Sequence, residues 1–289
     1  MRYRFLRYPM GKSKAVTFSF DDGCEQDIRL ADLMSAYKLK CTFNFNGKQF
    51  GQKNGNVISD EDARNHILKN GHEIAIHGYN HKSVGVVRAI EGIRDVLDCR
   101  TELEERFGTI IRGMANPAFG VSRLTGEETY GQVKKYLWDL DIAYARTISY
   151  VKNNYQLPAD WHNWSPTAHY SQTDILSEID LYLNLHKEGY VNPASRFPRL
   201  FYIWGHSYEL DRNKNWDLME EICRKFSSSE DIWCATNIEI YEYVNAYNSL
   251  VYSADGTMIY NPTLFELWLD IDGKVYSIKS GQTLKICEE

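Results

Sequence analysis

Short apolar runs alternate with amphipathic segments over the first 248 residues of the chain. The runs at 14–20 and 199–204 predict buried strands, and residues 26–38 carry apolar side chains on one face at helical spacing. Continued along the chain, this pattern gives about seven strand–helix units, which is typical of a parallel sheet covered by helices. At this length the pattern favours a closed barrel over an open sheet.

The pattern changes at residue 250. Two Asp-Gly pairs, at 255–256 and 272–273, separate β-rich runs, and Asp-Gly is a strong hairpin signal. Some 40 residues of strand are rarely stable alone, so we expect them to pack on the preceding domain. The sequence therefore predicts a main domain at 1–249 and a β-hairpin extension at 250–289. The extension could be a structural lid, a carbohydrate contact or an oligomerisation element.

Composition excludes several classes of protein. With 43% hydrophobic and 25% charged residues, the 289-residue chain is neither disordered nor of low complexity. The net charge of −6 argues against a nucleic-acid partner, and no apolar run approaches the roughly 18 residues of a membrane-spanning helix. The first residues lack the apolar core of a secretory signal, and the six cysteines include no C-x-x-C pair. We therefore expect a cytoplasmic protein with free thiols, of an oligomeric state that composition leaves open.

Aromatic residues are abundant, with 20 Tyr and 7 Trp. Flat side chains suit flat-sided ligands such as sugars, although they equally suit an aromatic-rich core. Three tryptophans are the strongest candidates for a sugar platform, because one ends a strand and two lie in a long polar loop at 149–171. They are Trp204, Trp161 and Trp164.

Polar side chains stand at the carboxyl ends of four predicted strands, where parallel α/β folds collect their functional groups. Two are carboxylates, three are imidazoles and one is an amide. These residues are Asp21, Asp22, His77, His81, Asn116 and His206.

Within this set, the Asp-Asp pair and the two histidines His77 and His81 predict a metal site. Two adjacent carboxylates repel each other unless a cation is near, although Asp-Asp-Gly is also compatible with an exposed turn. His77 and His81 are four residues apart, so one helical turn would aim both imidazoles at one point. One carboxylate with two imidazoles leaves coordination positions open, as in catalytic zinc sites, where the metal polarises a carbonyl and activates water.

These residues resemble the motifs of the polysaccharide deacetylase family, the group with NodB homology known as carbohydrate esterase family 4. The family's T-F-D-D-G corresponds to the stretch from Thr17 to Gly23, and its H-S/T-x-x-H to the stretch from His77 to His81. Its L-x-x-H corresponds to the stretch that ends at His206. The resemblance covers roughly residues 12–248. It implies an α/β fold, a distorted (β/α)7 TIM-like barrel, which the small C-terminal β appendage follows.

The resemblance also implies a chemistry, the hydrolysis of acetyl groups on a carbohydrate. The expected substrate carries N-acetyl groups, whose removal breaks a linear amide C–N bond, with O-acetyl groups as the alternative. Asp22, His77 and His81 would hold a divalent metal, most simply Zn²⁺, with Co²⁺ or Ni²⁺ as alternatives. Asp21 would be the general base that activates water, and His206 the general acid that protonates the leaving amine.

The chain departs from the family pattern in two motifs. Gly78 replaces the usual Ser or Thr, which removes a hydrogen bond that steadies the loop between the histidines. In the third motif, normally R-x-P-Y/F, the family's arginine falls on Asn116, while Arg112 lies four residues upstream and its reach to Asp21 stays open. We expect Arg112, Asn116 and Phe119 to line the substrate site. The resemblance implies a backbone oxyanion donor near Ala118 or Phe119.

Three further residues are assigned by their position alone. Glu209 follows His206 by three residues and could orient it. His162 and His169 lie in the 149–171 loop, where we expect them to be solvated, with substrate contact as the alternative.

Two other functions are compatible with the sequence. The first is a small-molecule amidase on the same scaffold, which opens cyclic amides or cleaves formyl and ureido groups. The second is a carbohydrate-binding or metal-binding module without turnover. The altered third motif and Gly78 favour this alternative, because both depart from the family pattern. The presence of Asp21, which metal binding alone does not require, favours the enzyme, whose partner would be an N-acetylated saccharide.

Overall fold

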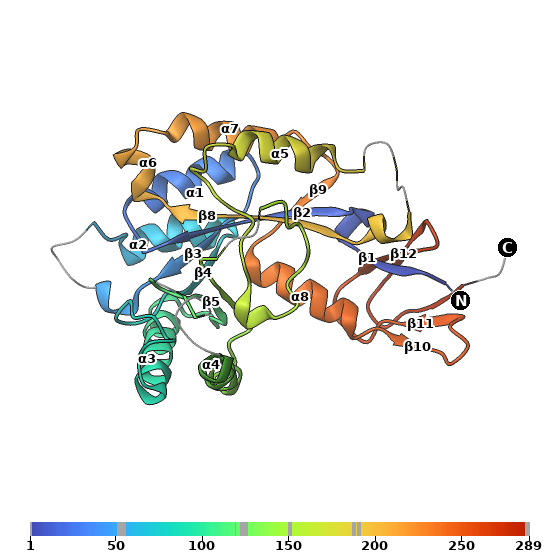
Figure 1. The fold of residues 1–289 in the computed structure, drawn as a ribbon, viewed down its shortest axis with the longest axis horizontal. Coiled ribbons are helices and arrows are strands. Elements are labelled where there is room, and N and C mark those ends of the chain that lie inside the picture. Colours follow the sequence, from blue (N-terminus) through green and yellow to red (C-terminus); the bar gives the residue numbers. More distant parts are fainter. Residues whose placement is uncertain are drawn as a thin grey trace.

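Figure 1 shows the fold in a computed structural model of the chain. The structure describes residues 2–50, 56–118, 120–121, 127–149, 152–186, 189 and 192–286.

The main sheet is parallel throughout, as the repeated strand–helix pattern predicts. The strand β9 (Ile232–Cys234) pairs with the first half of β2 (Lys14–Asp21), and β3 (Thr42–Phe45) pairs with the second half. From edge to edge the order is β6 (Tyr144–Arg146), β5 (Gly113–Ala115), β4 (Glu73–Ile76), β3 (Thr42–Phe45), β2 (Lys14–Asp21), β8 (Arg199–His206) and β7 (Ala168–His169).

One short segment joins the two edges of this sheet. Trp164 forms a parallel bridge with Arg146 at the end of β6, where Thr147 N–H donates to Trp164 O at 3.0 Å. Four residues later, β7 pairs with β8 at the opposite edge. The sheet therefore curls into a barrel closed by a single irregular connection, which confirms the predicted distorted (β/α)7 fold.

Helices cover the outside of the barrel. In Figure 1, α1 (Gln26–Ala36), α5 (Ile175–Asn184) and α7 (Trp216–Ser227) lie on one side of the sheet, and α3 (Ala89–Phe107) and α4 (Glu127–Asp139) lie on the other. The shorter elements are α2 (Asp60–Asp62), continued by η3 (Ala63–Ile67) and η4 (Leu68–Asn70), α6 (Tyr208–Arg212), and the turns η1 (Pro9–Gly11), η2 (Gly47–Gln49), η5 (Trp161–Asn163) and η6 (Pro193–Arg196). The longer helices are α1 (Gln26–Ala36), α3 (Ala89–Phe107), α4 (Glu127–Asp139), α5 (Ile175–Asn184), α7 (Trp216–Ser227) and α8 (Asn237–Asn248).

Local signals set several of these boundaries. Ser59 caps α2 by accepting a hydrogen bond from Asp62 N–H at 3.0 Å, and Gly71 ends η4 with a left-handed φ of +76°. α3 begins at Ala89, where the Glu91 carboxylate caps the helix by accepting a hydrogen bond from Arg88 N–H at 3.1 Å. None of the described helices is long and apolar enough to cross a membrane.

The first turn of α8 packs against buried residues of β2, β3 and β8. Asn237 is fully buried, accepts a hydrogen bond from Thr17 Oγ1 at 2.7 Å and donates one to Tyr202 Oη at 2.6 Å. Its own N–H donates to Thr42 Oγ1 at 3.0 Å. Buried polar groups at this depth are costly unless each has a partner, so the network fixes α8 against β2, β3 and β8.

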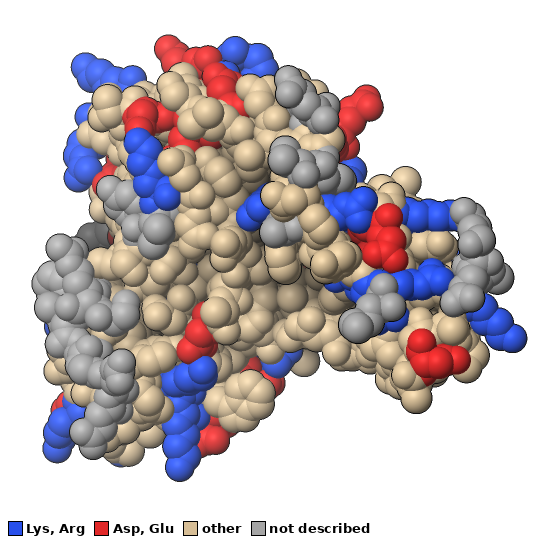
Figure 2. Space-filling view, turned by 45° about the vertical axis from the view of Figure 1, so that its right-hand side comes forward, with Lys and Arg blue, Asp and Glu red and all other residues tan. Residues whose placement is uncertain are grey.

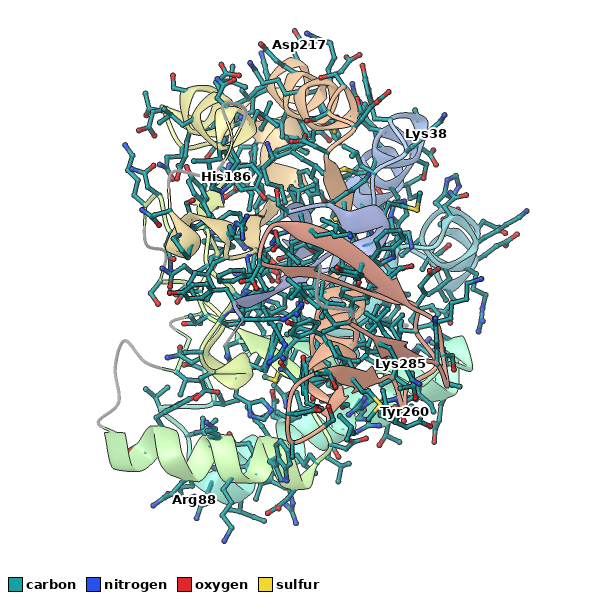
Figure 3. All side chains as sticks on the ribbon, turned by 90° about the vertical axis from the view of Figure 1, so that its right-hand side faces the viewer. Lys38, Arg88, His186, Asp217, Tyr260 and Lys285 are labelled. Atoms are coloured by element: carbon teal, nitrogen blue, oxygen red, sulfur yellow. The ribbon has the colours of Figure 1, made fainter. Side chains whose placement is uncertain are left out.

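The C-terminal residues form two antiparallel sheets at one end of the molecule, beside both chain ends (Figure 1). Turns lie at both predicted Asp-Gly pairs, and φ is positive at Gly256, Asp272 and Gly273. Figure 3 views this region from the front, with Tyr260 and Lys285 labelled. The sheets are β1 (Arg4–Arg7), β12 (Leu267–Ile271) and β13 (Lys274–Ile278), and β10 (Val251–Tyr252), β11 (Met258–Tyr260) and β14 (Thr283–Lys285).

The N-terminal strand belongs to this extension rather than to the barrel. β1 pairs along its whole length with β12, and the buried Arg7 and Asp270 form an ion pair at 2.7 Å. The boundary between 249 and 250 stays a prediction, but residues 4–7 lie on the extension side of it in space. Acidic and basic side chains alternate over the face drawn in Figure 2, so its described residues form no extended patch of one sign.

Candidate active site

Three potential metal ligands meet at the carboxyl ends of β2 and β4. Asp22 follows β2, His77 follows β4, and His81 lies four residues further on. Asp22 Oδ1 is 3.7 Å from His77 Nε2 and 3.5 Å from His81 Nε2, and the ligand atoms of the three residues lie within 4.8 Å of one another. The predicted helical turn between the histidines is wrong. They converge through a loop instead, in which Gly78 and His81 have φ of +75° and +54°.

The protonation of His77 suits a metal ligand. Its Nδ1 lies 2.9 Å from the carbonyl oxygen of Ala115, and a carbonyl oxygen can only accept. The ring proton therefore sits on Nδ1, and the lone pair of Nε2 faces Asp22. Asn46 Nδ2 donates to Asp22 Oδ1 at 3.1 Å and orients that carboxylate. One carboxylate and two imidazoles, oriented in this way, fit a divalent metal.

Asp95 of α3 steadies the loop that carries His81. Its carboxylate accepts hydrogen bonds from Tyr79 N–H at 3.1 Å and from Asn80 N–H at 2.8 Å. A Cβ atom on Gly78 would lie 2.6 Å from Asp95 Oδ2. The loss of the family's Ser or Thr at 78 is therefore matched by a buried carboxylate from another element, which occupies the space that a side chain there would need.

Asp21 is buried beside the three ligands and paired with an arginine that the sequence analysis missed. Arg146 Nη2, at the end of β6, donates to Asp21 Oδ2, and Asn44 Nδ2 donates to Asp21 Oδ1 at 2.9 Å. Burial would raise the pKa of Asp21, but Arg146, His77 and His206 outweigh it and hold the pKa below its usual value. Asp21 is therefore ionised and able to accept a proton.

Arg112 does not reach this site. It precedes β5 and therefore stands at the amino end of the barrel, where its Nη2 is 2.8 Å from Asp141 Oδ1. Asn116, at the other end of β5, is buried and donates from Nδ2 to the backbone oxygen of Arg146 at 3.1 Å. It supports Arg146 rather than lining an open substrate site. Arg146 is the last residue of β6, so its place at the carboxyl end of a strand is the signal that could have pointed to it.

His206 ends β8 and faces the metal ligands from the other side. Its Nε2 is 3.9 Å from Asp22 Oδ2, and its Nδ1 is 3.6 Å from Glu209 Oε1. Burial would lower the pKa of His206, but Glu209 and the two aspartates raise it above its usual value. His169 is not solvated as predicted, because its Nε2 lies 3.3 Å from Glu209 Oε2. His162 is also buried, with Nε2 at 2.7 Å from Ile142 O.

The structure brings one of the three tryptophan candidates to the site. Trp204 on β8 stacks under the Arg146 guanidinium, whose carbon is 4.6 Å from the ring centroid. Trp164 is wrong as a sugar platform, because it is 2% exposed and packs against Tyr202 in the core. Trp161 packs edge-on against Trp164, on the side that faces α8. Phe119 lies outside the described residues, whereas Ala118, the other candidate for the oxyanion donor, is exposed and has a φ of +52°.

Comparison with known proteins agrees with these motifs. Residues 3–130 match the family model of polysaccharide deacetylases. No curated protein sequence matches the chain.

Solved structures with the same fold have low sequence identity to the chain. A candidate polysaccharide deacetylase from Mycobacterium smegmatis is 18% identical, with a TM-score of 0.56 over 84% of this chain and 94% of that chain. The Xyl-CE4 domain of a multidomain xylanase from the hindgut metagenome of Trinervitermes trinervoides is 14% identical, with a TM-score of 0.51 over 81% and 92%. A mutant of a carbohydrate esterase family 4 pseudoenzyme is 13% identical, with a TM-score of 0.50 over 82% and 70%.

The matched segment contains Asp21, Asp22, His77 and His81, which the barrel holds together at its carboxyl end. Over residues 3–130 the chain is therefore similar in sequence to the polysaccharide deacetylase family, and the solved structures share its fold.

Proposed function

We propose that the protein is a metal-dependent hydrolase that removes acetyl groups from a carbohydrate. N-acetyl groups are the proposed substrate, and O-acetyl groups are the alternative. The family supports deacetylation of carbohydrate in general. The observation that carries the finer proposal is the placement of two groups suited to proton transfer on either side of Asp22. Asp21 is ionised and paired with Arg146 on one side, and His206 stands on the other.

A divalent cation held by Asp22, His77 and His81 would polarise the acetyl carbonyl and lower the pKa of water, and an imidazole-rich set prefers zinc, with cobalt or nickel as alternatives. The side chains of the chain supply the remaining chemistry. Asp21 accepts a proton from the attacking water, and Arg146 and Asn44 hold its carboxylate in place for this.

His206 supplies the second proton transfer. Its Nδ1 faces Glu209, so the opposite nitrogen, Nε2, faces the reacting groups around Asp22. As the C–N bond breaks, a proton from His206 Nε2 passes to the nitrogen, because a neutral amine leaves far better than an amide anion. The products are acetate and a free amino group on the sugar.

A module without turnover is the main competing function. The structural neighbours include a pseudoenzyme, so the fold alone does not decide activity. The buried pair of Asp21 and Arg146 speaks for the enzyme, because an ionised carboxylate beside the ligand set is not needed to hold a metal. A small-molecule amidase would use the same groups on a different substrate.

The test is acetate release from an N-acetylglucosamine oligomer series, with and without added zinc, beside the Asp21→Asn variant. We expect zinc-dependent release that Asp21→Asn abolishes, and its dependence on oligomer length measures how many sugar rings the site binds. No release by a zinc-loaded chain would reject the carbohydrate deacetylase. A panel of acetylated and cyclic amides would then separate a small-molecule amidase from a binding module.

A further inference from the structure

Glu209 on α6 lies between two imidazoles, and only one of them belongs to the reaction proposed above. We propose that His169 and Glu209 form a positioning pair that holds His206 with its Nε2 proton directed at the substrate. His169 ends β7, and Glu209 lies in the first turn of α6, three residues after His206. This inference rests on the proposed role of His206 and adds a residue that the sequence motifs do not include.

The pair is built into the mouth of the barrel. The side chain of Glu209 is 14% exposed, and those of His169 and His206 are each 22% exposed. Glu209 uses its two oxygens separately: Oε2 is 3.3 Å from His169 Nε2, and Oε1 is 3.6 Å from His206 Nδ1. A largely buried carboxylate needs such partners, and the two imidazoles hold the pKa of Glu209 well below its usual value against the effect of burial.

Ser171 determines which nitrogen of His169 carries the proton. The Ser171 N–H donates to His169 Nδ1 at 3.3 Å, and the Ser171 hydroxyl lies 2.9 Å from the same nitrogen. A backbone N–H can only donate, so Nδ1 is the acceptor and the ring proton of the neutral imidazole sits on Nε2. His169 therefore presents a proton to Glu209.

This tautomer also decides between two uses of the cluster. The ligand atoms of His169, His206 and Glu209 lie within 4.8 Å of one another, which would suit a second metal. A metal needs the lone pair of Nε2, whereas Ser171 places a proton there. Arg212 adds a positive charge, with Nη2 at 3.1 Å from Glu209 Oε1. The geometry favours a chain of charge-paired side chains, from His169 through Glu209 to His206, over a second metal site.

His169 matters to His206 because Glu209 has a competing partner. Arg212 is 61% exposed and can draw the Glu209 carboxylate outward, away from His206 Nδ1. His169 holds the other oxygen from β7, and its ring is fixed edge-on against Trp204 at 4.8 Å. Pairing of β7 with β8 sets this position, since His169 is in register with Trp204, two residues before His206.

Two variants of His169 test the pair in the zinc-loaded full chain. His169→Leu removes the donor, and His169→Gln offers an amide N–H at the place of Nε2. We expect His169→Leu to lower kcat by about 10–100-fold with KM unchanged, as for other residues that orient a catalytic group, and His169→Gln to restore most of the loss. His66→Leu, at a histidine paired with Asp32 on α1, is the control and should keep kcat.

Equal kcat for the Gln and Leu variants would overturn the pair, as would a rise in KM alone, which would make His169 a substrate contact. Acetate release by the native chain is required for this comparison, so its absence would reject the proposed function and leave the pair to a second measurement. That measurement is the tautomer of each histidine, read by NMR of the zinc-loaded chain with ¹⁵N-labelled histidine.

We expect the proton of His169 on Nε2 and a proton on His206 Nδ1, the latter lost or exchanging faster in His169→Leu. A His206 ring without a proton on Nδ1 would overturn the inference. Zinc content should be one per chain in the native protein and in both variants. A second zinc that both variants lose would overturn it too, by assigning the cluster to a metal.

Discussion

Arg146 at the end of β6 donates a hydrogen bond to Asp21 at the end of β2, although three strands lie between them in the sheet. The pair forms because the sheet curls and brings both strand ends to one mouth. Both side chains are buried, and Trp204 of β8 covers the guanidinium. The orientation of the proposed base therefore depends on a residue from outside the sequence motifs.

Loss of this arginine should affect both stability and turnover. In Arg146→Gln the buried Asp21 loses its charged partner, which costs roughly 3–5 kcal/mol of unfolding free energy. We expect acetate release to fall by at least about 100-fold, since the base is no longer held, while zinc remains bound. Urea unfolding, acetate release and zinc content measure the three effects.

Arg112→Gln is the matched control for that variant. Its ion pair with Asp141 is on the surface, so the unfolding free energy should change by less than about 1 kcal/mol and acetate release should stay the same. If the two variants changed places, with Arg112→Gln inactive and Arg146→Gln active, the assignment of Arg146 would be wrong.

The two adjacent aspartates should separate metal binding from proton transfer. Asp22→Ala removes one of three ligands, and we expect the purified protein to lose its metal on dialysis. Asp21→Asn should keep the metal and lose about 10²–10⁴-fold in turnover. Metal content by mass spectrometry and acetate release decide this. Metal retained in full by Asp22→Ala would overturn the ligand assignment.

Asp95 should control metal affinity without being a ligand. Asp95→Ala removes the acceptor for Tyr79 N–H and Asn80 N–H, so the loop that places His81 loses its fixed shape. We expect zinc affinity to fall by about 10–100-fold in calorimetric titrations. Asp98→Ala, an exposed position on the same helix, is the control. Equal affinities in the two variants would show that Asp95 has no such role.

Asp27, in the first turn of α1, should make stability depend on pH. It is fully buried, and neither carboxyl oxygen has a hydrogen-bond partner among the described residues. Burial raises its pKa to about 8, and the negative charge of Asp22 adds to the shift. Since the pKa in the unfolded chain is about 4, this carboxyl stabilises the fold fully below pH ~4, and its contribution is lost as the pH rises through about 8.

Asp27→Asn removes this dependence. Relative to the native chain, the variant should gain unfolding free energy by up to about 1.4 kcal/mol for each pH unit between about pH 5 and 8, and no more above that. Urea unfolding of both proteins at several pH values measures the difference. A difference that stays constant with pH would mean that Asp27 is ionised in the folded state.

Much of the fold and most of the residues at the centre of the site can be predicted from local sequence. Alternating apolar runs and helical spacing predict the strands and helices, and the Ser59 cap and Gly71 stop operate within a few residues of chain. The sequence also predicts the candidate ligands and proton-transfer groups, because they lie at strand ends or within a few residues of them. Asp21, Asp22 and His77 are examples, since the carboxyl ends of parallel strands must share one edge.

Tertiary structure decided what depends on contacts between distant segments. Sequence does not say that Arg146 rather than Arg112 meets Asp21, because this follows from which end of the barrel each side chain occupies. Trp164 is core rather than platform because it bridges the closing edge of the sheet, and β1 joins β12 across more than two hundred residues. Pairings of this kind are set by the curl of the sheet, which brings remote strand ends together and leaves no trace in local spacing.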